Sequence, residues 1–223
     1  MRKINYKVMR KKPQNQKLIF IDFDDVLLNT KTFRKELFSG LGVPYKYAVK
    51  CYVEMQNTRG RYDPHPYFMF IRRCYPNMRY RLLMRMLNAK QMRTRRHVFA
   101  DSEKFLRWLR KDGWRIELVS SGNYAMQKRK ILGSGLAKFF HKIHIVPITR
   151  AKGREIRRVL NGRRGNFVFI DDVKIIVDDV KKLHPEAFVF QMRRRRDREK
   201  SNRVDAVVKN FSQAVNILKK LHA

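Results

Sequence analysis

A run of apolar residues that leads directly into three carboxylates is the feature that most constrains the fold of this chain. The segment reads LIFIDFDDVLL, and its acids are Asp22, Asp24 and Asp25. Its β-branched and aromatic residues and its short length predict a buried strand over residues 18–23. Unpaired buried charge is costly, so acids at a strand end indicate a metal ion or reactive chemistry at the sheet edge where α/β proteins bind ligands. An acidic surface turn is the alternative, but the apolar runs on both sides disfavour it.

Predicted strands and helices alternate through the sequence after residue 98. Strands are expected at residues 114–119, 142–146, 166–170 and 187–192, and helices at about 102–110, 124–132, 151–160, 173–183 and 206–221. Asp101 or Ser102 is expected to cap the first of these helices. This alternation predicts an α/β fold, in which right-handed crossovers join the strands of a parallel sheet.

Residues 31–98 separate the first strand from the next α/β unit, and they contain several helical patterns divided by glycine and proline. The breakers fall within residues 40–44 and 60–66 and at residue 76. Short helices joined by tight connections predict a compact helical insertion. The segment carries sixteen Lys and Arg against three acids, and its Met and aromatic residues are expected to fill its core.

The charge of the whole chain is far from balanced. Its 223 residues include 53 Lys and Arg against 19 Asp and Glu, which gives a formal charge of +34. Such a field attracts polyanions and speeds their association, so nucleic acid, ribosomes and phosphorylated molecules are the expected partners. A general basic bias of the proteome, with no specific partner, is the alternative.

The sequence predicts a cytoplasmic protein with no membrane partner. Two cysteines, Cys51 and Cys74, are too few for a disulfide framework or a zinc site, and they are typical of a reducing compartment. No stretch approaches the roughly 20 apolar residues of a membrane span. The basic N-terminus lacks the apolar run of a secretory signal, whereas a mitochondrial presequence remains an open alternative.

Four motifs, taken in order, resemble those of the haloacid dehalogenase superfamily. They are DFDDVL at residues 22–27, ELVSSGN at 117–123, AKGREIRRVL at 151–160 and FVFIDDVK at 167–174. The resemblance covers nearly the whole chain outside the insertion. It implies a Rossmann-like core of residues 17–30 and 99–223, an inserted helical cap of the C1 type at residues 31–98, and a basic lead-in at residues 1–16. In relatives, such a cap closes over the site and selects the substrate.

The resemblance implies chemistry at the first two motifs. Asp22 would be the nucleophile that forms an aspartyl-phosphate. Asp24 would be the general acid for the leaving group and then the base that activates water, and its presence favours phosphoester hydrolysis over dehalogenation. Ser120 would bond a phosphoryl oxygen, and the substrate-binding residues expected beside it are Ser121, Gly122 and Asn123. Asp25 stands where many relatives have glycine.

The last two motifs imply a lysine and a metal ion. Lys152, at a helix N-terminus, would neutralise the nucleophile and the transferring phosphoryl group. Mg²⁺ prefers oxygen ligands. The ligands implied for it are Asp22, the backbone carbonyl of Asp24, and Asp172, with Asp171 either bound through water or orienting Lys152. The sequence departs from the family pattern at Ile176, where a second acid or amide is often found.

These expectations lead to one function and one alternative. The chain would be an Mg²⁺-dependent phosphomonoester hydrolase that acts on a phosphorylated small molecule or a nucleotide. The alternative is a basic protein that binds nucleic acid or ribosomes on the same scaffold, with little or no catalysis. The complete set of motifs favours the enzyme, whereas the charge excess and Ile176 favour the binding protein. The basic run Arg193–Arg196 follows the last strand, and it fits a phosphate-rich substrate and a solvated loop equally well.

Overall fold

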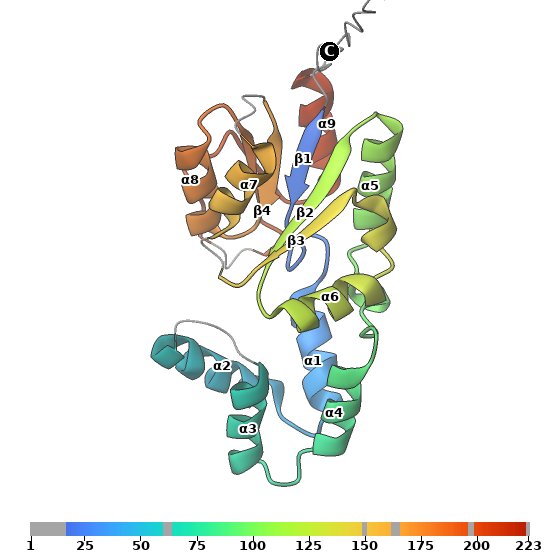
Figure 1. The fold of residues 1–223 in the computed structure, drawn as a ribbon, viewed down its shortest axis with the longest axis vertical. Coiled ribbons are helices and arrows are strands. Elements are labelled where there is room, and N and C mark those ends of the chain that lie inside the picture. Colours follow the sequence, from blue (N-terminus) through green and yellow to red (C-terminus); the bar gives the residue numbers. More distant parts are fainter. Residues whose placement is uncertain (1–16, 60–63, 149–150, 162–165, 196–198, 222–223) are drawn as a thin grey trace, which may run out of the picture.

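A parallel sheet of six strands forms the centre of the fold (Figure 1). The computed structural model describes residues 17–59, 64–148, 151–161, 166–195 and 199–221, so the expected lead-in at residues 1–16 and Arg196 lie outside the described residues. The strands are β1 (Leu18–Ile21), β2 (Arg115–Ser121), β3 (Lys142–Val146), β4 (Val168–Asp171), β5 (Phe188–Met192) and β6 (Ala206–Val208). Every neighbouring pair is parallel. The α/β fold predicted from the sequence is confirmed.

Helices cover both faces of this sheet, because its strands are apolar on both sides. They are α5 (Ser102–Lys111), α6 (Tyr124–Gly133), α7 (Lys152–Leu160), α8 (Lys174–Leu183) and α9 (Phe211–Leu221). In β1, Ile19 and Ile21 point into the apolar cluster that α5 and α9 share, whereas Phe20 points into the cluster under α7 and α8. Successive side chains of a strand face opposite sides, so a strand buried on both faces is apolar throughout.

The order of the strands places their carboxyl ends around one crevice. The order across the sheet is β3-β2-β1-β4-β5-β6. The chain therefore runs outward from β1 through β2 to β3, crosses back to β4 beside β1, and runs outward again. Ligands of open α/β sheets bind outside the carboxyl ends of the strands at such a reversal. The first, second and fourth motifs follow β1, β2 and β4, so this topology brings them together.

The segment between β1 and β2 forms a helical group at the carboxyl ends of the strands (Figure 1). Its helices, here called the helical insertion, are α1 (Thr30–Gly40), α2 (Tyr45–Arg59), α3 (Pro64–Cys74) and α4 (Tyr80–Asn88). They share an apolar cluster, which includes Phe33, Leu37, Phe38, Ile71 and Leu83 and which Met126 of α6 joins. Two short 3-10 helices lie in connections of the fold, η1 (Arg95–His97) and η2 (Ala137–Phe139).

The two connections between the insertion and the sheet are hydrogen-bonded to each other. The Asn29 N–H donates to the His97 carbonyl at 2.8 Å, and the Phe99 N–H donates to the Leu27 carbonyl at 3.0 Å. Leu28 forms an antiparallel bridge with Val98 between these bonds. The insertion therefore leaves and re-enters the core at one place.

Two sequence predictions are wrong, one for the last helix and one for the cap of α5. One helix was expected over residues 206–221, but residues 206–208 form β6, which pairs with β5, because β-branched Val207 and Val208 suit a strand better than a helix. Ser102, the alternative cap, is the first residue of α5, and its hydroxyl donates to the Leu27 carbonyl; Asp101, at the N-cap position, does not cap α5 with its side chain. Its carboxylate instead accepts a hydrogen bond from the Phe211 N–H at 2.9 Å, at the start of α9.

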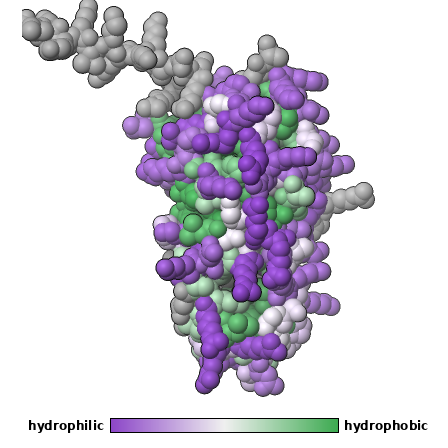
Figure 2. All heavy atoms as spheres, turned by 90° about the vertical axis from the view of Figure 1, so that its right-hand side faces the viewer, coloured by the Kyte–Doolittle hydropathy of each residue, from purple (hydrophilic) through white to green (hydrophobic). Residues whose placement is uncertain are grey.

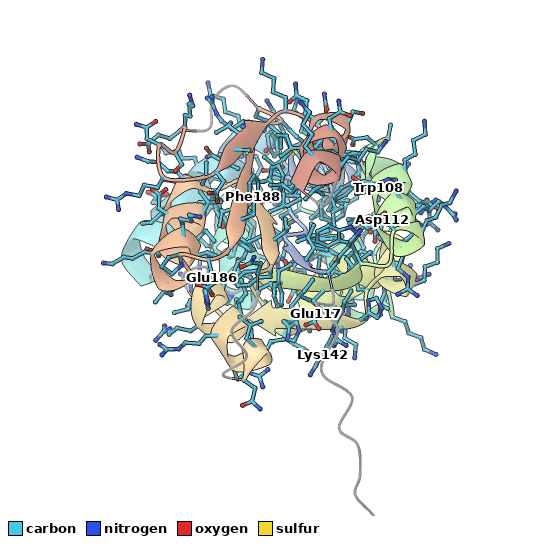
Figure 3. The ribbon with its side chains drawn as sticks, turned by 90° about the horizontal axis from the view of Figure 1, so that it is seen from above. Trp108, Asp112, Glu117, Lys142, Glu186 and Phe188 are labelled. Atoms are coloured by element: carbon cyan, nitrogen blue, oxygen red, sulfur yellow. The ribbon has the colours of Figure 1, made fainter. Side chains whose placement is uncertain are left out.

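Charged side chains cover much of the outside of the molecule. Figure 2 shows hydrophilic side chains over most of one face, with small apolar patches between them. Figure 3, which views the fold from above, shows long charged side chains pointing outward all around it. None of the helices within the described ranges is both long enough and apolar enough to cross a membrane.

Candidate active site

The four motifs meet at a cavity of about 410 Å³ between the carboxyl ends of the strands and the helical insertion. The predicted site residues that line it are Asp22, Asp24, Ser121, Gly122, Asn123, Lys152 and Asp172. Ser120 and Asp171 are also nearby, but they have no exposed surface and do not line the cavity. Folding thus brings together residues that are far apart in the sequence.

Lys152 joins two carboxylates at the centre of the site. Its Nζ lies 2.6 Å from Asp22 Oδ1 and 2.7 Å from Asp171 Oδ2. The other oxygen of Asp171 accepts a hydrogen bond from the Val173 N–H at 2.9 Å, which fixes the orientation of the carboxylate. Lys152 is the first residue of α7, so the N-terminus of this helix adds partial positive charge at the same place.

Burial dominates the electrostatics of Asp22. It raises the pKa of Asp22 to about 7; Lys152 opposes this increase, and the neighbouring Asp171 adds to it. Burial alone would lower the pKa of Lys152, but the carboxylates of Asp171 and Asp22 hold it above its ordinary value. The lysine therefore stays charged and places a positive charge beside the buried carboxylates of Asp22 and Asp171.

Three carboxylates form a set that suits a metal ion. Asp22, Asp171 and Asp172 each offer one oxygen, and these atoms lie within 4.8 Å of one another. Such a set fits Mg²⁺, which takes few protein ligands and keeps several waters. Ile176, where relatives often have an acid or amide, is buried in the apolar cluster under α8, so this position serves the core. The role of the Asp24 carbonyl as a further ligand stays a prediction.

Asp24 is bound by polar groups that the sequence analysis did not identify. Lys130 Nζ lies 2.6 and 2.7 Å from its two oxygens, and Gln127 Nε2 donates to it at 2.8 Å. The Thr30 hydroxyl also donates to Asp24, at 2.8 Å. Burial favours the neutral acid, but Lys130 and these donors outweigh it and lower the pKa of Asp24 to about 2. Asp24 is therefore ionised at neutral pH.

Gln127 and Lys130 lie on the buried face of α6, beside the apolar Met126 and Ile131. Polar residues at helical spacing within an apolar stripe are the signal that could have revealed them. A lysine on such a face needs an anionic partner, because an unpaired buried charge is costly. From the sequence, this helix was expected only as a crossover between two strands.

Hydrogen bonds hold the residues of the second motif in place at the end of β2 and in the turn that follows it. Ser120 Oγ accepts a hydrogen bond from Gln127 Nε2 at 2.9 Å. The Gly122 N–H donates to the Val146 carbonyl at 2.9 Å, and Asn123 Oδ1 caps α6 by accepting from the Met126 N–H at 3.1 Å. Of the two serines in this motif, Ser121 lines the cavity, although Ser120 was expected to contact the phosphoryl group.

Asp25 adopts a left-handed backbone conformation, with a φ of 56°. Glycine adopts this conformation most readily, and Asp is among the few other residues that tolerate it. Its carboxylate accepts a hydrogen bond from the Thr30 N–H at 3.2 Å, which ties the turn after β1 to the start of α1. The backbone conformation explains why this position accepts either glycine or Asp.

The fold is similar to that of solved haloacid dehalogenase-like hydrolases. No protein-family profile matches the sequence, and no curated protein matches it significantly. Comparison with solved structures is informative instead. A haloacid dehalogenase-like hydrolase of Burkholderia xenovorans has a TM-score of 0.69 and 18% sequence identity, over 93% of this chain and 99% of that chain. The fold that the four motifs implied is confirmed.

Two further neighbours differ in what they bind. The L-2-haloacid dehalogenase of Xanthobacter autotrophicus, with chloropropionic acid covalently bound, has a TM-score of 0.63 and 12% identity, over 91% of this chain and 98% of that chain. The HAD-hydrolase YfnB of Bacillus subtilis, bound to magnesium, has a TM-score of 0.63 and 12% identity, over 92% of this chain and 100% of that chain. Because one fold carries different chemistries, the activity has to be argued from the site.

Proposed function

We propose that this protein is an Mg²⁺-dependent phosphomonoester hydrolase that acts through a phosphorylated Asp22. The observation that carries the proposal is the buried set of Asp22, Lys152, Asp171 and Asp172 at one cavity. A magnesium-bound neighbour of the same fold supports the choice of metal ion. The second carboxylate of the first motif, Asp24, favours phosphoester hydrolysis over dehalogenation.

In the first half of the reaction, a carboxylate oxygen of Asp22 attacks phosphorus. The new bond between this oxygen and phosphorus forms as the bond to the organic group breaks, and the leaving oxygen takes a proton. Lys152 neutralises the nucleophile and the phosphoryl oxygens during this step. Mg²⁺, when held by Asp22, Asp171 and Asp172, supplies further positive charge to the phosphoryl oxygens.

Asp24 and Lys130 together accept and donate the protons that the two halves of the reaction need. Asp24 is ionised, so in the second half it accepts a proton from the water that attacks the phosphorylated Asp22. The proton for the leaving oxygen in the first half comes from the Lys130 ammonium group, which lines the same cavity and donates to both oxygens of Asp24. The proton taken from water then returns to Lys130, and the pair is restored.

Hydrolysis of p-nitrophenyl phosphate, with and without Mg²⁺, tests the proposal. We expect Mg²⁺-dependent phosphate release by the native chain, no turnover by Asp22→Asn, and a phosphoryl adduct on the Asp22 peptide after rapid quenching. Asp25→Asn is the matched control, because it changes a carboxylate that lines the same cavity and Asn also tolerates a positive φ. Turnover that survives in Asp22→Asn would overturn the proposal.

Binding of single-stranded nucleic acid is a second candidate function, and the surface of α3 and α4 supports it. Residues 64–100 contain nine Lys and Arg and no Asp or Glu. The exposed cations on and between these helices are Arg72, Arg73, Arg79, Arg81 and Arg85. The Arg72 guanidinium lies 4.5 Å from the Tyr80 ring centroid. Cations combined with aromatic rings are typical of surfaces that bind single strands. Retention on a single-stranded RNA column, tested against rising salt, is the first experiment.

A further inference from the structure

The side of the cavity formed by the helical insertion differs in chemistry from the side formed by the sheet. The sheet side carries the carboxylates together with Lys130 and Lys152. The insertion side presents five aromatic rings with one arginine beside them: Phe33, Phe38, Tyr52, Tyr67, Phe68 and Arg34. A phosphate group suits the first side, and a different kind of group is needed to fill the second.

The aromatic rings hold one another in place. Tyr67 meets Phe38 edge to face with ring centroids 6.1 Å apart, and it meets Tyr52 in the same way at 6.0 Å. Phe68 packs against Tyr67 at 5.2 Å. The Tyr67 hydroxyl donates a hydrogen bond to the Ala48 carbonyl at 2.7 Å, which anchors the centre of this cluster. Side chains packed in this way keep their positions without a ligand, so the aromatic wall is preformed.

Arg34 places a cation at the edge of this wall. Its guanidinium lies 4.8 Å from the Tyr52 ring centroid, a geometry in which the ring attracts the cation. The planar guanidinium presents several donors in fixed directions, which suits acceptor atoms or an anionic group. Among the described residues that line the insertion side, none is acidic. A cationic organic group would therefore find no carboxylate on this side, and the Arg34 guanidinium would repel it.

We propose that the substrate of this site is a phosphomonoester whose organic group contains a planar ring with hydrogen-bond acceptors, as in a nucleoside 5′-monophosphate. The inference rests on the proposed phosphatase function for the phosphate end and on the aromatic wall for the other end. Flat rings pack favourably against aromatic side chains, stacked or edge to face. The cavity of about 410 Å³ lies within the range of pockets that bind small organic ligands.

Hydrolysis of adenosine 5′-monophosphate and ribose 5-phosphate tests the proposal, because the two share the same ester and only the first carries the ring. We expect kcat/KM for adenosine 5′-monophosphate to be at least about tenfold higher. Phosphotyrosine and pyridoxal 5′-phosphate form a second arm. A preference for either compound over ribose 5-phosphate would also support recognition of a ring. In that case the compound that is preferred, and not a nucleoside monophosphate, would indicate the class of substrate. Equal kcat/KM for all four would overturn the proposal.

Variants of the aromatic wall test which side chains recognise the ring. Phe68→Leu and Tyr52→Leu each remove a ring and keep an apolar side chain. We expect both to move the ratio of the two kcat/KM values toward one, with hydrolysis of ribose 5-phosphate near native. Phe70→Leu is the matched control, because Phe70 lies in the same helix, is 39% exposed and does not line the cavity. A native ratio in both wall variants would contradict the proposal.

Binding to Asp22→Asn separates this inference from the proposed function. Calorimetric titration should show that this variant binds adenosine 5′-monophosphate more tightly than ribose 5-phosphate. If the native chain hydrolyses no phosphomonoester and the variant still shows this preference, the proposed function fails and the inference stands. If the variant binds the two equally, or binds neither, the wall does not recognise a ring and the inference fails.

Discussion

Lys130 is one of 53 basic residues in this chain, yet it is almost fully buried and contacts both oxygens of Asp24. At the scale of single residues, Lys130 helps keep Asp24 ionised, because it lowers the pKa of this carboxylate. In the proposed proton path, the ionised Asp24 accepts the proton of the attacking water and the Lys130 ammonium group donates the proton to the leaving group. The behaviour of Lys130 is therefore the sharpest test of the proposed proton path.

We expect Lys130→Met to slow hydrolysis of an alkyl phosphate more than hydrolysis of an aryl phosphate. A general acid contributes at least about 10²-fold where the leaving group is poor, whereas p-nitrophenolate departs without a proton. The measurement is kcat on adenosine 5′-monophosphate and on p-nitrophenyl phosphate. Lys128→Met, an exposed lysine of the same helix, is the control and should behave as the native chain. Equal reductions on both substrates would contradict a role in proton transfer.

A second buried acid, Glu117, gives a test of stability against pH. It has no exposed surface; its carboxylate lies 2.7 Å from His144 Nε2 and accepts from Arg115 Nε at 2.7 Å. Burial raises its pKa, but His144 and Arg115 outweigh burial and hold the pKa below the ordinary value of 4.5. An acid whose folded pKa is lowered stabilises the fold above its unfolded pKa. This stabilisation is lost as the pH falls through the folded pKa.

We therefore expect Glu117→Gln to lower the free energy of unfolding by about 1–3 kcal/mol near neutral pH. The difference from the native chain should shrink as the pH falls below 4.5. Urea unfolding across this range measures both effects. Glu186→Gln, at an exposed acid, is the control; Figure 3 labels both acids. A difference that stays constant with pH would mean that the ionised form of Glu117 is not what stabilises the fold.

At the scale of elements, α6 matters most, because it carries Gln127 and Lys130 to the site. Its first turn is capped by Asn123. Its last residue, Gly133, lies against the backbone of Met92, so that a Cβ atom at this position would be 1.5 Å from the Met92 oxygen. The absence of a side chain at Gly133 thus allows the helix to approach the chain that leads out of the insertion.

We expect Gly133→Ala to destabilise the fold by about 1–3 kcal/mol or more, since a backbone oxygen cannot yield to the added methyl group. Gly40→Ala is the matched control: Gly40 also ends a helix, and its added Cβ would meet nothing within 4 Å. That change should be neutral or stabilise by up to about 1 kcal/mol. The midpoint of urea unfolding measures both variants. Similar shifts in the two would show that the close approach to Met92 is unimportant.

Elements with a regular apolar period could be predicted from the sequence, whereas features that depend on distant partners could not. The strands around Phe20 and Phe169 were predicted from their own residues. Strand β6 has three residues, and only its pairing with β5 makes it a strand. Asp101 looked like the cap of α5, but the group that it binds, the Phe211 N–H, is 110 residues away. Lys130 lies 106 residues from Asp24, and although its place on the apolar face of a helix is a local sign of burial, that sign does not identify the partner.

At the scale of the whole molecule, the net charge of +34 predicts binding of polyanions that weakens steeply with salt. The question is whether α3 and α4 carry this binding. We expect the triple change Arg73→Gln, Arg81→Gln and Arg85→Gln to reduce the salt slope for a single-stranded oligonucleotide by about 0.7 for each phosphate that the variant no longer neutralises. The measurement is Kd against salt concentration.

The control removes the same amount of charge elsewhere, through Lys104→Gln, Lys111→Gln and Lys138→Gln. These three lysines are exposed and lie in the α/β part of the fold, outside the helical insertion. This variant should bind more weakly but keep a slope close to native. If the slope falls equally in both triple variants, the net charge of the whole molecule attracts the oligonucleotide. In that case α3 and α4 form no specific binding surface for it.

The paired connections at Asn29–His97 and Leu27–Phe99 have a consequence for how such a protein changes over generations. A segment whose two ends already meet can be lengthened, shortened or exchanged without moving the points at which the chain enters the sheet, and the entropy of closing it varies only slowly with its length. A single exchange of the gene segment that encodes the helical insertion can therefore replace the aromatic wall as a unit, while Asp22 and Lys152 keep their positions. Preference for a new substrate would then arise by exchange of a module and would not need a rebuilt catalytic end.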